Sequence, residues 1–144
     1  MKTVRIFFIL GGIIWGLLHI LFNGKEITFF LIMHIKVVAA IIIKDNKILI
    51  GRRASFESLP GWWEFPGGKP EKGESNEEAI RRELMEELGV KTRVGELITN
   101  YNHKFLGNVY DLWFYKTKIL KGQIKLNAHD KLAWIDPNNY SKFK

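Results

Sequence analysis

Two hydrophobic runs in the first half of the chain predict a β-hairpin. Residues 36–43 are rich in valine, alanine and isoleucine, and residues 47–50 continue as Lys-Ile-Leu-Ile. Asp45 and Asn46 lie between the runs. β-Branched side chains favour strands, whereas Asp and Asn favour tight turns. We therefore expect two antiparallel strands joined by a short turn.

The second half continues with strand patterns. Residues 54–61 predict a loop, because Ser, Pro and Gly gather there. Residues 91–98 predict a strand interrupted by Gly95, residues 109–119 a long aromatic strand, and residues 132–135 a strand that closes the sheet.

A helix is predicted at residues 76–88, before strand 91–98. Ser75 followed by Glu78 is a capping box, and Gly89 suits the left-handed residue that often ends a helix. An apolar stripe for the core has three members: Ile80, Leu84 and Leu88. Together the elements predict an α/β domain with a mixed sheet.

Three glutamates of this helix predict a metal site. Glu83, Glu86 and Glu87 have the spacing i, i+3 and i+4, which places their carboxylates on one helix face. Like charges at this spacing repel one another, and carboxylate oxygens suit Mg²⁺ or Mn²⁺. An acidic, solvated helix face is the alternative. The glycine-rich turn at Gly67 and Gly68, with Glu74 six residues later, favours the metal site.

The segment from Gly68 to Val90 resembles the signature of the Nudix hydrolases. The matching positions are Gly68, Glu74, Arg82, Glu83, Leu84, Glu86, Glu87, Gly89 and Val90. The preceding Trp-Glu-Phe-Pro-Gly-Gly-Lys resembles the MutT-like branch, which includes enzymes acting on 8-oxo-dGTP and on CTP or dCTP. The likeness extends from Ile35 to Asp136. It implies a Nudix-type α/β/α sandwich with a mixed sheet.

The resemblance also implies roles for individual residues. Glu83, Glu86 and Glu87 would bind Mg²⁺ (or Mn²⁺ as a substitute), with the Gly67 carbonyl as a further ligand and one glutamate as the base for the attacking water. Arg82 would orient a glutamate, and Glu74 would support the loop or a second metal. These implied catalytic residues are Glu83, Glu86, Arg82 and Glu74.

Residues near the signature are expected to bind substrate. Lys69 lies close enough to meet phosphate charge, and in MutT-like proteins an arginine pair at the place of Arg52 and Arg53 lies near the nucleotide. An exposed basic strand end is the alternative interpretation of the pair. Phe65 is one of several aromatic residues that could stack on a base or belong to the core. The others are Trp62, Trp63, Tyr101, Phe105, Tyr110 and Trp113.

His129 and Asp130 precede the last predicted strand. Relatives often have a metal-assisting or water-assisting glutamate just before this point, where this chain has Ala128. A single loop histidine is more often a packing residue. We therefore leave both residues out of the expected catalytic set.

Composition narrows the class of protein. The chain has 144 residues, of which 47% are hydrophobic, and this fits one globular domain with one core. The absence of cysteine excludes disulfides and thiolate zinc sites. The net charge of +7 is spread along the sequence, so we expect an anionic nucleotide as partner and no nucleic acid. The sequence does not define an oligomeric state.

The N-terminal segment has two interpretations. From Ile6 to Phe22 the chain has no Lys, Arg, Asp or Glu, and a helix of this length would span about 25 Å, near the lower limit for a membrane. Residues 1–32 would then be a membrane anchor, with the domain of residues 33–144 in the cytoplasm. Alternatively they are an upstream extension of a product that begins at Met33. After Pro137 only seven residues follow, so we expect a domain shortened at its C-terminus.

The expected function is Mg²⁺-dependent hydrolysis of a nucleoside triphosphate to a monophosphate and pyrophosphate, in sanitation of the nucleotide pool and DNA repair. Oxidised purine nucleotides such as 8-oxo-dGTP and the cytidine nucleotides CTP and dCTP are the expected substrates. Two alternatives remain: a hydrolase of another nucleoside diphosphate linked to a group X, and a nucleotide-binding module without turnover. The sequence offers no cysteine and no serine elbow as a covalent nucleophile, so direct attack by water is the simpler mechanism.

Overall fold

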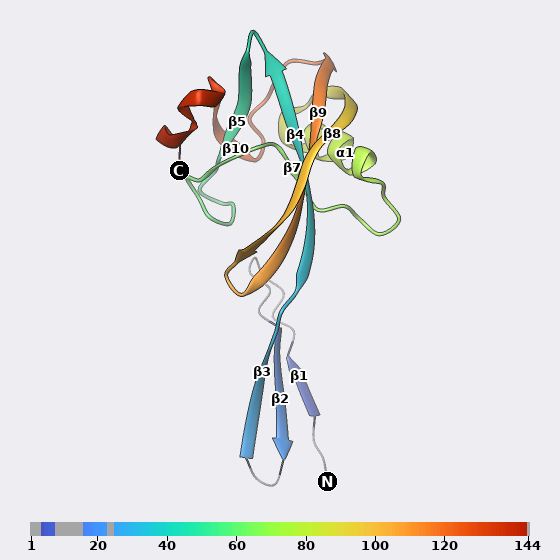
Figure 1. Cartoon of the computed structure of the whole chain (residues 1–144), viewed down its shortest axis with the longest axis vertical. Helices are drawn as coiled ribbons and strands as arrows, with labels where there is room; N and C mark the ends of the chain where they lie inside the picture. Colours follow the sequence, from blue (N-terminus) through green and yellow to red (C-terminus); the bar gives the residue numbers. More distant parts are fainter. Residues whose placement is uncertain (1–3, 8–15, 23–24, 144) are drawn as a thin grey trace.

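The computed structural model describes residues 4–7, 16–22 and 25–143. Its main sheet has the strand order β10-β5-β4-β9-β8, with β6 paired to β5 and β7 paired to β4 (Figure 1). The strands are β4 (His34–Lys44), β5 (Lys47–Arg53), β6 (Trp63–Glu64), β7 (Gly67–Gly68), β8 (Lys91–Phe105), β9 (Asn108–Lys121) and β10 (His129–Ile135). The sheet is mixed because β4 and β9 are parallel, whereas the other pairs are antiparallel.

The hairpin predicted from the first hydrophobic runs is β4 and β5. Ile43 pairs with Ile48 and Lys44 with Lys47. The turn residues Asp45 and Asn46 both have positive φ, at 50° and 59°, as the tightest hairpin turns require. The prediction of this hairpin is confirmed.

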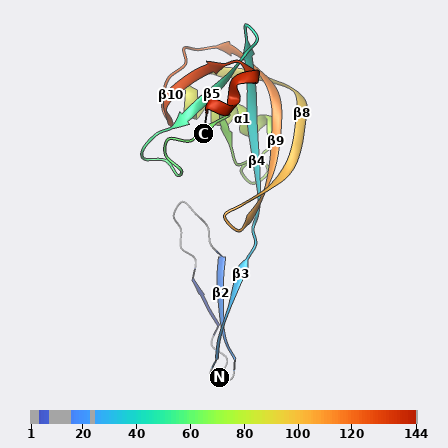
Figure 2. The same cartoon turned by 60° about the vertical axis from the view of Figure 1, so that its left-hand side comes forward.

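The strand β8 is longer than predicted, and it forms a hairpin with β9. β8 continues to Phe105 instead of ending near residue 98, and its tip projects beyond the body of the sheet (Figure 2). Residues 99–104 are polar apart from Tyr101 and are exposed, so they lack the apolar alternation that marks a half-buried strand. The interruption predicted at Gly95 is confirmed, because the pairing shifts register between Val94 and Leu97.

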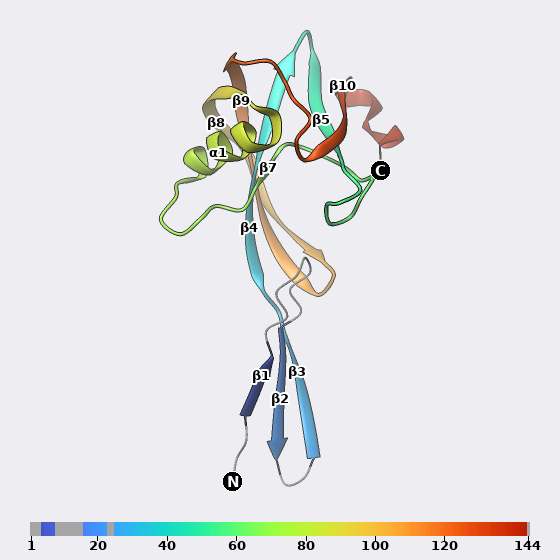
Figure 3. The ribbon, with the colours of Figure 1, turned by 180° about the vertical axis from the view of Figure 1, so that it is seen from behind.

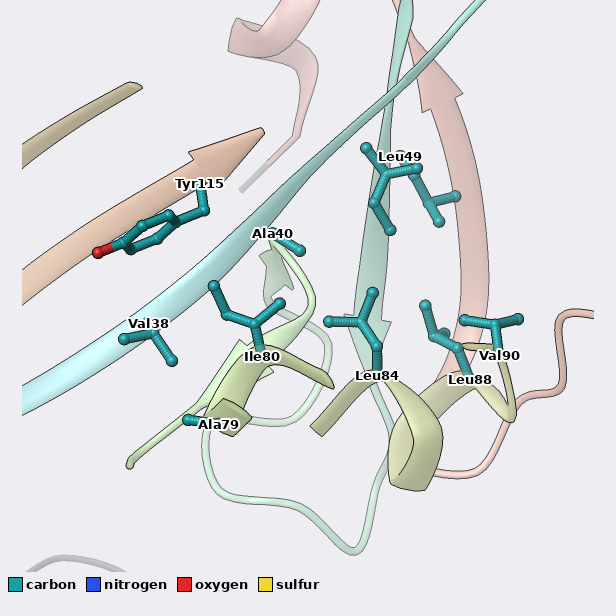
Figure 4. Packing of buried hydrophobic residues seen from close by; sticks show 10 residues of the cluster. Val38, Ala40, Leu49, Ala79, Ile80, Leu84, Leu88, Val90 and Tyr115 are labelled. Atoms are coloured by element: carbon teal, nitrogen blue, oxygen red, sulfur yellow. The ribbon is translucent and has the colours of Figure 1, made fainter. Parts of the chain in front are cut away.

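Helix α1 (Asn76–Leu88) has the predicted bounds and packs on the sheet through the predicted stripe. Ile80, Leu84 and Leu88 are fully buried. They join a core with Val38 and Ala40 from β4 and further residues around them (Figure 4). The further residues are Ile42, Leu49, Ala79, Val90 and Tyr115. Burying this stripe turns the neighbouring, glutamate-bearing face of α1 toward β7, which lies beside the helix (Figure 3).

The predicted α/β fold with a mixed sheet is confirmed. Within the described ranges the sheet is accompanied by one α-helix, α1, and by the 3-10 helix η1 (Pro137–Lys142) that follows β10. The last residues of the chain, from Pro137 to Lys142, therefore form a short 3-10 helix.

The N-terminal segment does not show the expected long helix where the structure describes it. The strands β1 (Val4–Phe7), β2 (Gly16–Phe22) and β3 (Lys25–Leu31) form an antiparallel sheet of their own. Residues 8–15, the middle of the apolar run from Ile6 to Phe22, lie outside the described residues. Among the described residues we find no helix with the length and apolar character needed to cross a membrane.

Candidate active site

The loop before α1 is fixed by local hydrogen bonds. The Glu78 amide donates to the Ser75 hydroxyl over 3.2 Å, and the Ser75 amide donates to the Glu78 carboxylate over 2.9 Å. This is the predicted capping box. Gly89 ends the helix with a φ of 67°, as its sequence position predicted. The helix therefore presents Glu83, Glu86 and Glu87 from a backbone that is fixed at both ends.

A cleft of about 700 Å³ opens between this helix face, the glycine turn and the loop before β6. All three glutamates line it, together with Gly67 and Gly68. The Gly67 amide donates to Glu87 Oε2 over 3.1 Å. A β-carbon at Gly68 would overlap the Glu83 carboxylate. The turn thus brings backbone into contact with two of the glutamates, which only a residue without a side chain allows.

Arg82 connects the glutamate cluster to the preceding loop. Its Nε and Nη2 donate to the two oxygens of Glu74, each over 3.0 Å, and Nη2 also donates to the Lys69 carbonyl over 3.1 Å. Its Nη1 lies 2.9 Å from Glu83 Oε1 and 3.4 Å from Glu86 Oε2. Glu74 also accepts from the Glu71 amide over 2.8 Å. The arrangement is that of a guanidinium that orients carboxylates and a loop, rather than one open to a ligand.

The pKa values of several carboxyl groups at the site are shifted from their ordinary value. Burial is the largest cause that raises the pKa of both Glu83 and Glu87, and for Glu87 the pKa rises to about 7. The pKa of Glu74 is instead lowered, mainly by the hydrogen bond from Arg82. Keeping Glu83 and Glu87 ionised together therefore costs free energy, which a bound cation would offset. An all-oxygen donor set of this kind fits a hard divalent cation such as Mg²⁺.

The two arginines at the end of β5 are engaged in ion pairs. Arg52 Nε and Nη2 each lie 2.7 Å from an oxygen of Asp130, and Arg52 is not among the residues that line the cleft. Arg53 lines the cleft but donates to both Glu64 oxygens, over 2.7 and 2.8 Å. It also donates to the carboxylate of Glu57 and to the hydroxyl and carbonyl of Ser58. Binding of substrate by either arginine stays a prediction.

Lys69 and Phe65 both line the cleft, and their binding of substrate stays a prediction. Five of the seven aromatic residues considered from sequence also line it: Trp62, Trp63, Phe65, Phe105 and Tyr110. The rings of Trp62 and Phe105 are 6.2 Å apart between centroids. Tyr101 and Trp113 are not among the lining residues. The cleft therefore combines charged oxygens with flat apolar surfaces.

Two further residues, Glu64 and His129, lie close to Glu87 and were not among the site residues expected from sequence. His129 is buried at 2% exposure, and its Nε2 lies 3.2 Å from Glu64 Oε1. Glu64, Glu87 and His129 each offer one ligand atom within 4.8 Å of the others, which is close enough to hold a metal ion. Burial lowers the pKa of His129, but the hydrogen bond to Glu64 and the charge of Glu87 outweigh it and leave the pKa raised. The contact spans 65 residues of sequence, so no local spacing could have indicated it.

Comparison with known proteins agrees with this geometry. A model of the NUDIX domain matches residues 33–144. The chain belongs to the Nudix family. The CTP pyrophosphohydrolase of Escherichia coli K12 is 39% identical over 103 residues, which cover 72% of this chain and 76% of that protein. The 8-oxo-dGTP diphosphatase of the same organism is 36% identical over 80 residues, which cover 56% of this chain and 62% of that protein.

Solved structures support the same assignment. The solution structure of the E. coli ORF135 protein has a TM-score of 0.65 and is 35% identical, covering 78% of this chain and 80% of that one. The MutT protein of methicillin-resistant Staphylococcus aureus 252 has a TM-score of 0.60 and is 38% identical, covering 78% of this chain and 86% of that one. As a Nudix hydrolase the chain acts on pyrophosphate bonds, and the family uses a divalent metal ion. The predictions of family and enzyme class are confirmed.

Proposed function

We propose that this Nudix hydrolase cleaves a nucleoside triphosphate to a nucleoside monophosphate and pyrophosphate, with Mg²⁺ as its cofactor. One observation carries the proposal: the carboxylates of Glu83, Glu86 and Glu87 share a single cleft with aromatic side chains. Such a cleft offers both a charged site for a metal-bound phosphate chain and apolar surface for a base.

The three glutamates and the Gly67 carbonyl would hold the metal. When bound, Mg²⁺ would neutralise phosphate charge and lower the pKa of a coordinated water. Arg82, through its contacts with Glu83 and Glu86, would keep two of these carboxylates oriented. Glu74 would act one step further away, by fixing the guanidinium of Arg82 and the loop that follows Lys69.

Hydrolysis needs one proton acceptor and one leaving group. A water oxygen forms a bond to phosphorus, the bond from phosphorus to the bridging oxygen breaks, and the released oxygen leaves with its electron pair as part of pyrophosphate. The water proton passes to a carboxylate. One of Glu83, Glu86 and Glu87, all of which line the cleft, would accept this proton. Lys69 at the cleft would meet the departing phosphate charge.

The names of the relatives point to the substrate. The E. coli relatives are named for CTP and for 8-oxo-dGTP, and we propose CTP, dCTP and 8-oxo-dGTP as the first substrates to test. Phe65 and its aromatic neighbours in the cleft would stack on the base. Removal of oxidised or surplus nucleotides in the cytoplasm is the corresponding cellular role.

The test is a panel of triphosphates assayed for pyrophosphate release with Mg²⁺. ADP-ribose should be included, because a relative from Methanocaldococcus jannaschii that is 36% identical over 109 residues is named ADP-ribose pyrophosphatase. We expect pyrophosphate from at least one triphosphate, its loss in excess EDTA, and its loss in the Glu86→Gln variant with an unchanged circular dichroism spectrum.

Two results would contradict the proposal. Binding of nucleotide without pyrophosphate release in excess Mg²⁺ would indicate a binding module. Full turnover by Glu86→Gln would remove the exposed end of the glutamate cluster from the reaction.

A further inference from the structure

The His129 ring occupies a place that only a glycine leaves open. His129 begins β10 and pairs with Arg53 of β5, and Gly51 lies two residues before Arg53 on the same strand. A β-carbon at Gly51 would overlap Cδ2 of the ring and would lie 2.6 Å from Nε2. The side chain of His129 is fully buried. The ring therefore lies against the β5 backbone at Gly51, where an added side chain would displace it.

A row of charged side chains leads from the cleft loop to this ring. On the loop, Arg53 donates to the Glu57 carboxylate over 3.2 Å and to Ser58 Oγ over 3.0 Å. It also donates to both oxygens of Glu64, over 2.7 and 2.8 Å. Glu64 Oε1 then lies 3.2 Å from His129 Nε2. Three elements, β5, β6 and β10, are thus joined by side chains that fix one another.

The row ends at Glu87. A Glu87 oxygen lies within 4.8 Å of ligand atoms of both His129 and Glu64. On another side, Glu87 Oε2 accepts from the Gly67 amide over 3.1 Å. Glu87 therefore lies between a backbone amide that donates to it and the buried imidazole, and loss of either neighbour would leave its carboxylate freer to rotate, which would weaken its use as a metal ligand.

Direct metal binding by His129 is the competing interpretation, and two observations count against it. The Arg53 guanidinium already bonds both oxygens of Glu64, so a dication there would lie beside a fixed positive charge. His129 Nδ1 is buried and has no hydrogen-bond partner among the described residues, whereas a metal-bound histidine usually donates its second N–H to a carboxylate or carbonyl. The contacts are better explained by support of Glu87.

We propose that Glu64 and His129 are positioning residues that hold Glu87 in place for the metal, and that Arg53 anchors them rather than contacting substrate. The inference rests on the proposed function in one respect, that Glu87 is a metal ligand. It predicts that changes at His129 weaken metal binding through Glu87, without removing a ligand.

The test measures Mn²⁺ binding to the full chain without nucleotide, by electron paramagnetic resonance of the free ion. We expect His129→Gln and Glu64→Gln each to raise the Mn²⁺ dissociation constant by about tenfold, the lower end of effects seen for residues that support metal ligands. Gly51→Ala should do the same, because it displaces the ring and leaves every charged group present. His34→Asn, at an exposed histidine, is the control and should leave the constant unchanged.

A double-variant comparison separates positioning from a general loss of structure. In a Glu87→Gln background, His129→Gln should weaken Mn²⁺ binding by less than twofold, because the residue it supports is already altered. In a Glu83→Gln background the tenfold effect should persist. A structural defect would weaken binding equally in both backgrounds and would overturn the proposal.

Other outcomes are equally decisive. Unchanged Mn²⁺ affinity in folded Glu64→Gln and His129→Gln would overturn the positioning role. Fewer ions bound per chain after His129→Gln, or a Co²⁺ absorption spectrum that loses intensity in that variant at full occupancy, would show that His129 is itself a ligand. A wild-type chain that binds no Mn²⁺ would contradict the proposed function instead.

Discussion

The Glu83 carboxylate lies so close to the backbone of Gly68 that a β-carbon on Gly68 would overlap it. Glu83 belongs to α1 and Gly68 to β7, so this contact joins the helix to the sheet at the cleft. The contact sets how far the carboxylate reaches, because Arg82 Nη1 holds it on another side over 2.9 Å. Gly68 and Glu83 are both positions of the sequence signature from Gly68 to Val90, and this contact gives a structural reason for having them together.

Gly68→Ala should therefore inactivate the enzyme without unfolding it. The added methyl group displaces the Glu83 carboxylate, and a misplacement of about 1 Å can lower turnover by about 100-fold. Steady-state kinetics with Mg²⁺ and the preferred nucleotide measure the effect. The matched control is Gly95→Ala on β8, where a β-carbon meets the Lys116 carbonyl at 3.2 Å, and activity should stay within about twofold. Equal losses in both variants would contradict the role of the Gly68 contact.

Glu74→Gln should loosen the loop that precedes the helix. Glu74 accepts two hydrogen bonds from Arg82 and one from the Glu71 amide, and a glutamine can accept through only one of its two terminal atoms. We expect turnover to fall by about tenfold. Amide hydrogen exchange should become faster at residues 70–74 and remain unchanged in the β4 and β9 core. Faster exchange throughout the chain would instead indicate general destabilisation.

The sequence was sufficient for the elements whose signals are local. The capping box at Ser75, the end of the helix at Gly89 and the turn at Asp45 and Asn46 each depend on residues within a few positions of one another. The grouping of Glu83 with Glu86 and Glu87 is likewise a property of helix geometry. The capping box, the helix end and the turn appear in the structure as predicted, whereas metal binding by the three glutamates stays a prediction.

Features that depend on tertiary pairing were missed. The contact of His129 with Glu64 needs β10 and β6 on opposite sides of β5, which no local pattern specifies. The polar half of β8 forms a strand because β9 supplies its hydrogen-bond partners, from Asn100 paired with Trp113 to Phe105 paired with Asn108. For the apolar run from Ile6 to Phe22 the two interpretations, a membrane anchor and an upstream extension, stay predictions, because its middle lies outside the described residues.

Leu84→Ala should destabilise the fold through its core. Leu84 is fully buried in the cluster that joins α1 to β4 and β5. Removing its side chain should lower the free energy of unfolding by about 3 kcal/mol, the middle of the range for buried leucines. Urea denaturation measures the change. Met85 is the adjacent control because it is 42% exposed, and Met85→Ala should cost less than about 1 kcal/mol. A similar loss in both variants would place Leu84 outside the principal core.

Glu87 gives the metal-free protein a definite pH dependence. In the folded chain this carboxyl has a pKa of about 7, raised mainly by burial from its ordinary value of 4.5. Between these values the folded state binds more protons than the unfolded state, so stability falls as pH rises from about 5 to 8. The raised pKa of His129 acts in the same direction, because its stabilising charge is present below its ordinary value of 6.5 and is lost as pH rises through the folded value.

Glu87→Gln isolates the carboxylate's part of this dependence. In EDTA the variant should be more stable than wild type by about 3 kcal/mol at pH 8 and by less than about 1 kcal/mol at pH 5. Mg²⁺ or Mn²⁺ should reverse the order at pH 8, because the metal stabilises the ionised Glu87 of wild type and gains less from glutamine. Thermal denaturation of both proteins at the two pH values, with and without metal, measures the stability difference under each of these conditions. A wild type that stays more stable than the variant in EDTA at pH 8 would show that the ionised carboxylate is already compensated by its protein neighbours, and the argument for a metal at this site would lose its electrostatic basis.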